Sequence, residues 1–450
     1  MNRIDNEHVT APVHAALVVF FAAYFFMLAA LAPARAETAI QEVRSTSGVT
    51  AWLVEDYSVP IIAVKFIFEG GTTQDPAGKE GLMTLMSGLF DEGAGDLDSD
   101  AFQLALDDAG AEMGFSAGLD GLSGSMRMLE EKRREAFDLL ALAVNRPRFD
   151  QAPMDRIRAQ LITGIEASAR DPETQAGIAF SKALYGDHPY ARRSDGTPET
   201  LRSMTADDLR TLHRRIFARG KMHVGVVGAI DAATLAQELD RVFGNLPAEP
   251  ELTAVPEVTP KFGQEVRVDY PLPQTTIRLA YPGVKRDDPD FFAAFLMNHV
   301  LGGGTFSSRL FDEVREKRGL TYGIGSGLST PKASASLSIG TSTNADRAAE
   351  TLSVIREVVA KMAAEGPTEE ELADAKRYLI GSYAINNLDS SSAIASTLVG
   401  LQVEGLGIDY IRRRPDLIGA VTREQAAAMA KRLLSVDPAV LILGPAADGG

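Results

Sequence analysis

The sequence has no cysteine in its 450 residues. Disulfide bonds, thiolate zinc sites, iron–sulfur clusters and cysteine nucleophiles are therefore all excluded. Positive charge is also scarce, because 45 Lys and Arg stand against 61 Asp and Glu and leave a net charge of −16. Such a chain repels a phosphate backbone, so nucleic acid is not expected as a partner. Only six histidines remain for metal binding or acid–base chemistry.

The composition that is present is that of a globular protein. Hydrophobic residues make up 45% of the chain and charged residues 24%, which argues against both disorder and a polytopic membrane protein. A single domain commonly spans roughly 150 residues. The length therefore predicts two or more domains, each with its own core.

An apolar segment without charge occupies residues 15–32 and runs into Ala34-Arg35-Ala36. An apolar stretch followed by small residues in an A-x-A pattern is typical of a secretory signal peptide. We predict a signal peptide at 1–36, cleavage after Ala36 and a periplasmic mature chain. The alternative is an uncleaved anchor, because this segment is just long enough to span a bilayer. In that case the membrane would be contacted only through the leader.

A repeat divides the rest of the chain. A helix-like run starts at Thr205 and leads into an apolar strand that ends at Gly228. A similar run starts at Thr422, 217 residues later, and its strand ends at Gly444, 216 residues after Gly228. The segments beginning at Ser123 and Ile339 form a third pair with the same offset of 216, each a strand end, a turn and an amphipathic helix. The repeat predicts two homologous halves.

Four prolines between Leu246 and Phe262 favour an extended linker over a helix. We predict domains at 37–245 and 263–450 joined by a Pro-rich linker at 246–262; they are called the first and second half below. Strands with hairpin connections mix with long helices in both halves. The predicted fold class is therefore α+β, with two tandem mixed α/β sandwich domains, each a sheet covered by helices.

Histidine spacing argues against a zinc site. A hydrolytic zinc needs about three protein ligands, commonly histidines one helical turn apart. Beyond the leader the chain keeps His188, His213, His223 and His299, and none lies within four residues of another. Structural roles are expected for the first three, and only His299 precedes a candidate site. The signatures of serine hydrolases, phosphate loops and dinucleotide folds are also missing.

The exception is the segment at 301–329. Gly302, Gly303 and Gly304 let the backbone bend and approach a ligand closely, and we predict them as substrate-binding residues. A serine at 307 or 308 is predicted to cap the following helix, and Gly319 to end it.

Two donors accompany this helix. Arg315 lies four residues after Phe311 and shares its apolar face, and Tyr322 follows in a strand-like run. A guanidinium and a phenol at one cleft could stabilise a carbonyl oxygen that becomes negative during acyl transfer. The alternative is that Arg315 pairs with a neighbouring carboxylate and Tyr322 merely packs.

Four segments together resemble the pitrilysin-like family of zinc peptidases, which includes mitochondrial processing peptidase and bacterial relatives. The segments are residues 69–82, 185–217, 224–231 and 301–326. The resemblance covers almost the whole chain after the leader. It implies the two-domain fold of that family.

Catalytic members of the family carry H-x-x-E-H after the Gly-Leu of the first half. The resemblance places Thr84, Ser87 and Gly88 at its His, Glu and His positions. It places Thr163 at the third ligand, a glutamate, by alignment through the Asp-Pro at 171–172. Hydroxyls and glycine do not replace imidazole or a carboxylate base, so we predict no metal and no cofactor in this chain.

The family also keeps an Arg and a Tyr seven residues apart, and Arg315 and Tyr322 have this spacing. In two-chain members, one subunit supplies zinc and the other resembles this sequence. The resemblance therefore implies a heterodimer in which this chain lends both side chains in trans to a zinc-bearing H-x-x-E-H partner that cleaves extended peptides. The alternative is a peptide-binding pseudoenzyme or envelope scaffold with no catalytic contribution.

Overall fold

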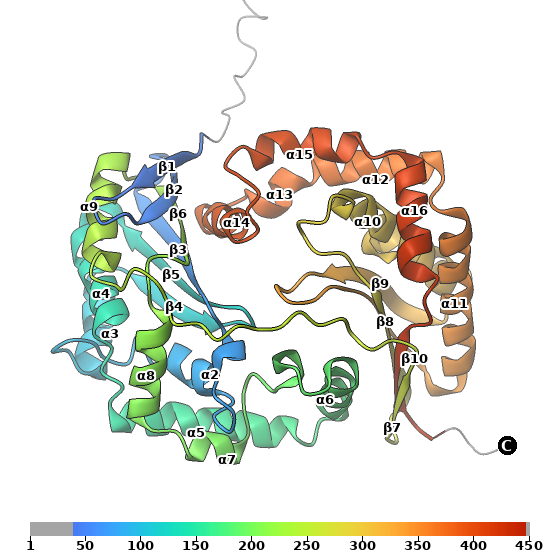
Figure 1. The fold of residues 1–450 in the computed structure, drawn as a ribbon, viewed down its shortest axis with the longest axis horizontal. Helices are drawn as coiled ribbons and strands as arrows, with labels where there is room; N and C mark the ends of the chain where they lie inside the picture. The colour runs from blue at the N-terminus through green and yellow to red at the C-terminus, as the bar shows by residue number, and fades with distance from the viewer. Residues whose placement is uncertain (1–38, 447–450) are drawn as a thin grey trace, which may run out of the picture. The chain divides into compact units, whose positions relative to one another are not determined.

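The computed structural model describes residues 39–446 (Figure 1). The predicted leader at 1–36 lies outside the described residues. Ile40 begins one compact unit that contains both halves. Within 39–446, no helix is long and apolar enough to cross a membrane.

The first half is built on a six-stranded sheet with the order β1-β2-β6-β3-β5-β4. Neighbouring strands are antiparallel except for the parallel pair β2–β6. The strands are β1 (Gln41–Arg44), β2 (Thr50–Glu55), β3 (Ile61–Glu69), β4 (Glu112–Ala117), β5 (Gly121–Leu129) and β6 (Met222–Gly228).

The second half is built on a five-stranded sheet with the order β7-β11-β8-β10-β9. Only β7 and β11 are parallel. The strands are β7 (Glu265–Asp269), β8 (Gln274–Pro282), β9 (Thr321–Ser329), β10 (Ser336–Asn344) and β11 (Ala439–Gly444).

The two sheets confirm the predicted repeat. Strands β2, β6, β3, β5 and β4 stand in the same order as β7, β11, β8, β10 and β9, with the same parallel pair at the same place. Thr205 and Thr422 begin matching helices, and each forms a capping box with the residue three positions on. The mixed α/β fold class is also confirmed.

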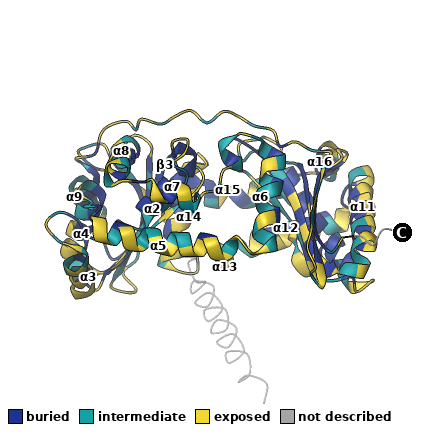
Figure 2. Cartoon of the chain, turned by 90° about the horizontal axis from the view of Figure 1, so that it is seen from below, coloured by how far each residue is buried: buried dark blue, intermediate teal, exposed yellow. Residues whose placement is uncertain are grey.

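Helices cover both sheets, and their amphipathic faces form the cores. Figure 2 shows exposed residues along the outer side of α5. The helices of the first half are α2 (Leu82–Ser87), α3 (Ser99–Asp108), α4 (Arg133–Asn145), α5 (Gln151–Ser168), α6 (Pro172–Tyr185), α7 (Pro198–Arg202), α8 (Ala206–Ile216) and α9 (Ala232–Phe243). Those of the second half are α10 (Phe291–Asn298), α11 (Ala348–Glu365), α12 (Glu369–Gly381), α13 (Tyr383–Asn387), α14 (Ser391–Val403), α15 (Tyr410–Gly419) and α16 (Arg423–Leu434).

One helix of each half packs on the sheet of the other. Phe180 of α6 packs with Leu441 of β11, and Leu398 of α14 packs with Val227 of β6. A side chain at Gly225 of β6 would come within 2.6 Å of a carbonyl oxygen of α14, so glycine is needed for this contact. The reciprocal exchange explains why both halves belong to one compact unit.

The predicted linker connects α9 to β7, and no helix or strand is assigned between Phe243 and Glu265. The segment is held against the first half, because Gln74 and Thr253 exchange two hydrogen bonds of 3.0 and 2.7 Å. Domain boundaries at 37–245 and 263–450 stay a prediction.

Candidate functional site

The first predicted site lies on α2. The Thr84 hydroxyl donates to the carbonyl oxygen of Ser194 at 2.7 Å, and the Ser87 hydroxyl donates to the carbonyl oxygen of Thr84 at 2.8 Å. Both hydroxyl protons are therefore used by backbone carbonyls that the first half itself supplies.

Helix α5 packs against the end of α2. A side chain at Gly88 would come within 3.1 Å of Cγ2 of Ile157, so the glycine leaves room for that residue. Thr163 is exposed, and its hydroxyl donates to the carbonyl oxygen of Ala159 in its own helix at 2.8 Å. Seven residues make almost two helical turns, so Gly164 rather than Thr163 shares the face of Ile157.

These side chains do not fit zinc. Zinc in proteins is bound by imidazole, thiolate and carboxylate groups. The positions on α2 and α5 offer engaged hydroxyls and glycines instead. Across residues 39–446, no three His, Asp or Glu side chains lie close enough together to hold a metal ion.

Asp75, which belongs to none of the motifs predicted to form a site, fixes the start of α2. Its two carboxylate oxygens accept the N–H groups of Gly81 and Met83, each at 2.9 Å. Burial raises the pKa of Asp75 to about 7, although these backbone hydrogen bonds oppose the shift. The signal available was an acidic residue shortly before a helix start.

Two of the four histidines hold backbone carbonyls. Nε2 of His188 lies 2.8 Å from the carbonyl oxygen of Pro256, and Nε2 of His213 lies 2.9 Å from that of Val144. Burial lowers the pKa of His213 to about 4, so this imidazole is neutral at pH 7. Both residues have the structural roles that their contexts predict.

The other two histidines also make internal contacts. Nε2 of His223 lies 3.3 Å from a carboxylate oxygen of Glu69. His299 is buried and stacks on Tyr378 with ring centroids 5.2 Å apart. Burial lowers the pKa of His299. Its contacts are those of a core histidine.

Gly302 and Gly303 end a π-helical turn, η4 (His299–Gly303), and Gly304 is the residue that follows it. A side chain at Gly302 would come within 2.6 Å of Oγ and 2.8 Å of the backbone N of Ser326 on β9. A side chain at Gly304 would come within 2.9 Å of the carbonyl oxygen of His299. The backbone at Gly302 therefore approaches β9 too closely for a side chain, and the backbone at Gly304 approaches His299 too closely for one. Substrate binding by the three glycines stays a prediction.

The helix after the glycines differs from the prediction at its start. Neither Ser307 nor Ser308 caps it through the side chain, because their hydroxyls donate to the carbonyl oxygens of Gly304 and Thr305. Its core is the π-helical turn η6 (Phe311–Glu316). Its end is as predicted, since Gly319 takes a left-handed φ of +59°.

Arg315 lies on η6, and its guanidinium forms an ion pair with Glu316. The guanidinium also lies 4.8 Å from the centre of the Phe311 ring. The pairing with a neighbouring carboxylate that the sequence left open is therefore present. The pair is partly exposed, with 38% of the Arg315 side chain accessible.

Tyr322 does not pack into the core, because 91% of the residue is exposed. It lies in a β-bulge, where Tyr322 and Gly323 of β9 stand opposite the single residue Ser342 of β10. Bulges redirect side chains and are common beside active sites. No local sequence pattern had indicated this bulge.

The structure brings Arg315 and Tyr322 together in one cleft of about 360 Å³, which Gln274 and Asn344 also line. The residues at 302–304 and the α2 positions do not line it.

Tyr322 also lines an adjoining cleft of about 610 Å³, together with Glu173 of α6. Glu173 pairs with Arg278 of β8 at 3.0 Å, so a helix of the first half contributes a carboxylate to this site. No sequence pattern indicates that contribution, because it depends on the packing of α6 on the sheet of the second half.

A family profile described as "Peptidase M16 inactive domain" matches residues 203–379. An uncharacterised zinc protease of Mycobacterium leprae is 30% identical over 348 residues, which cover 76% of this chain and 78% of the relative. The non-peptidase homologue YmxG of Helicobacter pylori is 24% identical over 349 residues, with coverage of 76% and 79%. A crystal structure of a peptidase M16 inactive domain from Pseudomonas fluorescens is 31% identical, covers 92% of this chain and 99% of its own, and has a TM-score of 0.84.

Proposed function

This chain belongs to the M16, or pitrilysin-like, family of peptidases, and we propose that it is a zinc-free subunit of a periplasmic two-chain metallopeptidase. It is a homologue of the inactive type. In the proposed heterodimer, a homologue with the H-x-x-E-H motif supplies the zinc and the base. This chain supplies Arg315 and Tyr322. The periplasmic location rests on the predicted leader at 1–36.

The observation that carries the proposal is that Arg315 and Tyr322 line one cleft. Tyr322 is exposed there by a β-bulge, although a tyrosine gains more from burial than from exposure. Arginine and tyrosine, together with tryptophan, are enriched among the residues that contribute most to binding at protein interfaces. The arrangement suits two hydrogen-bond donors whose partners come from another chain and its substrate.

The ion pair between Arg315 and Glu316 does not prevent this role. A partly exposed pair of this kind contributes about 0–1 kcal/mol, so a substrate or partner can displace it. The freed guanidinium would stabilise the oxyanion of the tetrahedral intermediate, and the Tyr322 hydroxyl would donate to a substrate carbonyl. The start of β9, an edge strand of its sheet, would then receive an extended peptide by strand addition.

The test is a peptide-cleavage assay with this chain, a zinc-bearing homologue, and the mixture. Activity is expected only in the mixture. Arg315→Ala and Tyr322→Phe should lower its kcat by roughly ten- to thousandfold, the effect of losing a transition-state donor. Arg318→Ala and Tyr57→Phe are matched controls, because both residues are exposed and lie outside the cleft. Cleavage by the mixture that all four variants leave unchanged would contradict the catalytic role.

A second candidate is a peptide-binding pseudoenzyme or envelope scaffold. The ion pair between Arg315 and Glu316 favours it, since the guanidinium is engaged rather than free. Under this alternative, Tyr322→Phe and Arg315→Ala would weaken peptide binding to the isolated chain, and the activity of the mixture would not depend on them. Fluorescence anisotropy with a labelled unstructured peptide measures this binding directly.

A further inference from the structure

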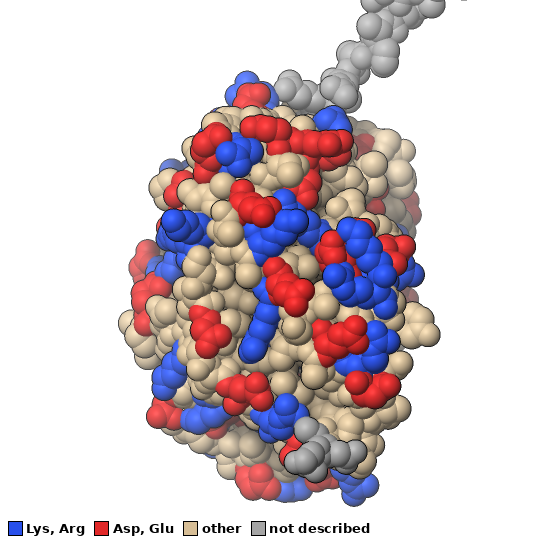
Figure 3. Space-filling view, turned by 90° about the vertical axis from the view of Figure 1, so that its right-hand side faces the viewer, with Lys and Arg blue, Asp and Glu red and all other residues tan. Residues whose placement is uncertain are grey.

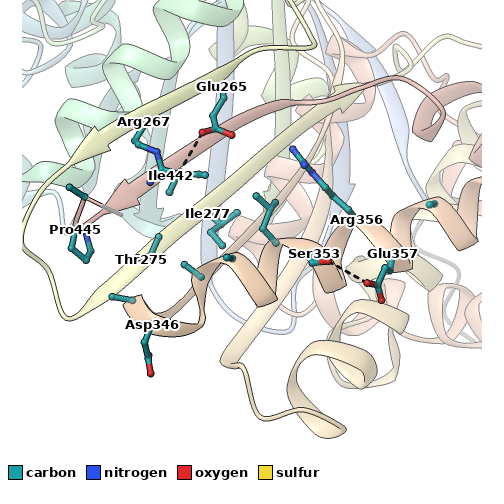
Figure 4. A pocket seen from close by; sticks show the side chains of 16 residues that line it. Glu265, Arg267, Thr275, Ile277, Asp346, Ser353, Arg356, Glu357, Ile442 and Pro445 are labelled. Carbon is teal, nitrogen blue, oxygen red and sulfur yellow. Dashed lines mark hydrogen bonds and ion pairs between the residues drawn. The ribbon is translucent and has the colours of Figure 1, made fainter. Parts of the chain in front are cut away.

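A groove of about 840 Å³ lies on the second sheet and shares no lining residue with the Arg315 cleft (Figure 4). Ile277 of β8, Ile442 of β11 and Leu352 of α11 supply apolar lining. The charged lining residues are Glu265, Arg267, Asp346, Arg356 and Glu357. Over the face that carries α11, basic and acidic side chains are interspersed, so no single-sign patch identifies an ionic partner (Figure 3).

The internal repeat shows which part of the first half corresponds to this groove. The last strand of each half, β6 or β11, lies between a parallel and an antiparallel neighbour. Val226 of β6 is paired with a residue of β2 and a residue of β3, and Ile442 of β11 is paired with a residue of β7 and a residue of β8. The matched positions are Val226 with Ile442, Leu53 with Arg267, and Val64 with Ile277. The three first-half residues are buried together in the core that includes α9.

The helical wall of the groove corresponds in the same way. Strands β5 and β10 and the helices after them, α4 and α11, begin 215 residues apart, one less than the offset of 216 predicted for these segments. Asp138 and Asn145 are therefore the counterparts of Ser353 and Ala360. In the first half both side chains contact α9. Asp138 pairs with Arg241 at 2.9 Å, and the Asn145 amide donates to a carbonyl oxygen of α9 at 2.7 Å. Their counterparts Ser353 and Ala360 line the groove instead.

Helix α9 thus fills in the first half the place that is a groove in the second. After β11 the described residues comprise only Pro445 and Ala446, which line the groove. No counterpart of α9 occurs in 39–446. Arg356 has no ion pair or hydrogen bond in that range, and its guanidinium points toward the strands (Figure 4).

We propose that the groove binds an amphipathic helix of a partner polypeptide in the place that α9 takes in the first half. The helix would set an apolar stripe against Leu352 and the strands, and an acidic side chain opposite Arg356. This is the helix-in-groove mode of recognition, in which residues on one helical face act as anchors. The inference does not depend on the role of Arg315 and Tyr322.

The chain offers both a clean label position and a probe. Because it has no cysteine, Ser353→Cys creates a unique thiol in the groove for an environment-sensitive dye. The probe is a synthetic peptide of residues 231–246, which contains α9. We expect a saturable blue shift of the dye. The same peptide with Leu235, Leu239 and Phe243 changed to serine should give none.

Two groove variants test the site in the full-length protein. Leu352→Asp should weaken binding of the probe by about tenfold or more, because it places a charge against the apolar stripe. Ser353→Glu with the dye at Ala349→Cys should weaken it as well, and this exposed substitution leaves the core untouched. Ser58→Cys carries the control dye on an exposed loop outside the groove.

The acidic contact is tested by a double-mutant cycle. Helices α4 and α9 follow strands β5 and β6, which are both antiparallel to β3, so the two helices run in the same direction. Asn145 contacts the carbonyl oxygen of Val242, so the counterpart of Arg356 in α4, residue 141, lies opposite Glu238, one turn before Val242. A probe with Glu238→Gln should bind about two- to fivefold more weakly than the original to the wild-type groove, and equally to Arg356→Ala. Arg347→Ala is the matched control outside the groove.

Three outcomes would overturn the proposal. The first is the absence of saturable binding at Ser353→Cys. The second is an equal response of the Ser58→Cys control. The third is a dye shift that grows with protein concentration without any probe, because the groove would then be filled by a second copy of the chain.

Discussion

The carboxylate of Glu69, at the end of β3, holds Nζ of Lys332 from the second half at 2.5 Å. The same carboxylate contacts His223 of β6. The loop of Lys332 is also fixed through its backbone, since its N–H donates to the carboxylate of Asp120 at 2.9 Å. Polar contacts therefore join the two halves in addition to the exchanged helices.

This contact predicts a pH dependence of stability. The hydrogen bond with His223, and then that with Lys332, lowers the pKa of Glu69 from 4.5 to about 2. A depressed pKa in the folded state stabilises the protein fully above about pH 4.5, and the contribution is lost as the pH falls toward 2. Glu69→Gln should flatten the fall of the free energy of unfolding across this window in urea titrations. Lys332→Met should flatten it in part, and unchanged slopes in both variants would refute the assignment.

The buried side chain of His213 predicts a second pH range, separate from that of Glu69, in which the free energy of unfolding changes. Burial lowers its pKa from 6.5 to about 4, so the unfolded chain binds a proton that the folded protein does not. The free energy of unfolding should therefore fall as the pH drops from about 6.5 to 4. His213→Gln, which keeps a donor for the carbonyl of Val144, should reduce that fall. The same urea series separates this effect from that of Glu69, and a slope as steep as in wild type would count against it.

A side chain at residue 302 should destabilise the folded protein. Gly302→Ala places a methyl group within 2.8 Å of the backbone of Ser326, where β9 cannot yield without moving. Overpacking of this kind costs about 1–3 kcal/mol. Gly327→Ala on β9, the strand of Ser326, is the matched control, because nothing lies within 4 Å of its added methyl group. Thermal unfolding of both variants measures the difference, and equal melting temperatures would contradict the packing role.

The fold class and the repeat could be predicted because their signals are local. Thr205 and Thr422 cap matching helices, and the apolar strands that end at Gly228 and Gly444 are read from a few consecutive residues. The exchange of α6 and α14 could not be predicted, since nothing in Phe180 or its neighbours specifies which sheet covers it. Long-range packing of this kind leaves no periodic pattern in the chain.

The two residues of the candidate cleft could be named from the sequence, but the geometry of the cleft could not. The spacing of Arg315 and Tyr322 was visible, but the bulge that exposes Tyr322 depends on pairing with β10. Thr163 was placed at the third metal-ligand position by alignment through the Asp-Pro pair at 171–172. A one-residue difference there turns a helix by about 100°, which separates Thr163 from the face of Ile157.

The helical face of α5 leads to the last prediction. The wild-type chain should bind no stoichiometric zinc, because its donors at these positions are hydroxyls and glycines. Restoring donors at α2 with Thr84→His, Ser87→Glu and Gly88→His requires a further carboxylate on α5. Gly164→Glu should supply it better than Thr163→Glu, since residue 164 shares the face of Ile157. Both sets carry Ile157→Ala to make room beside residue 88. Isothermal titration with zinc compares the two sets, and tighter binding by the Thr163→Glu set would show that the alignment, rather than the helix geometry, gives the true ligand position.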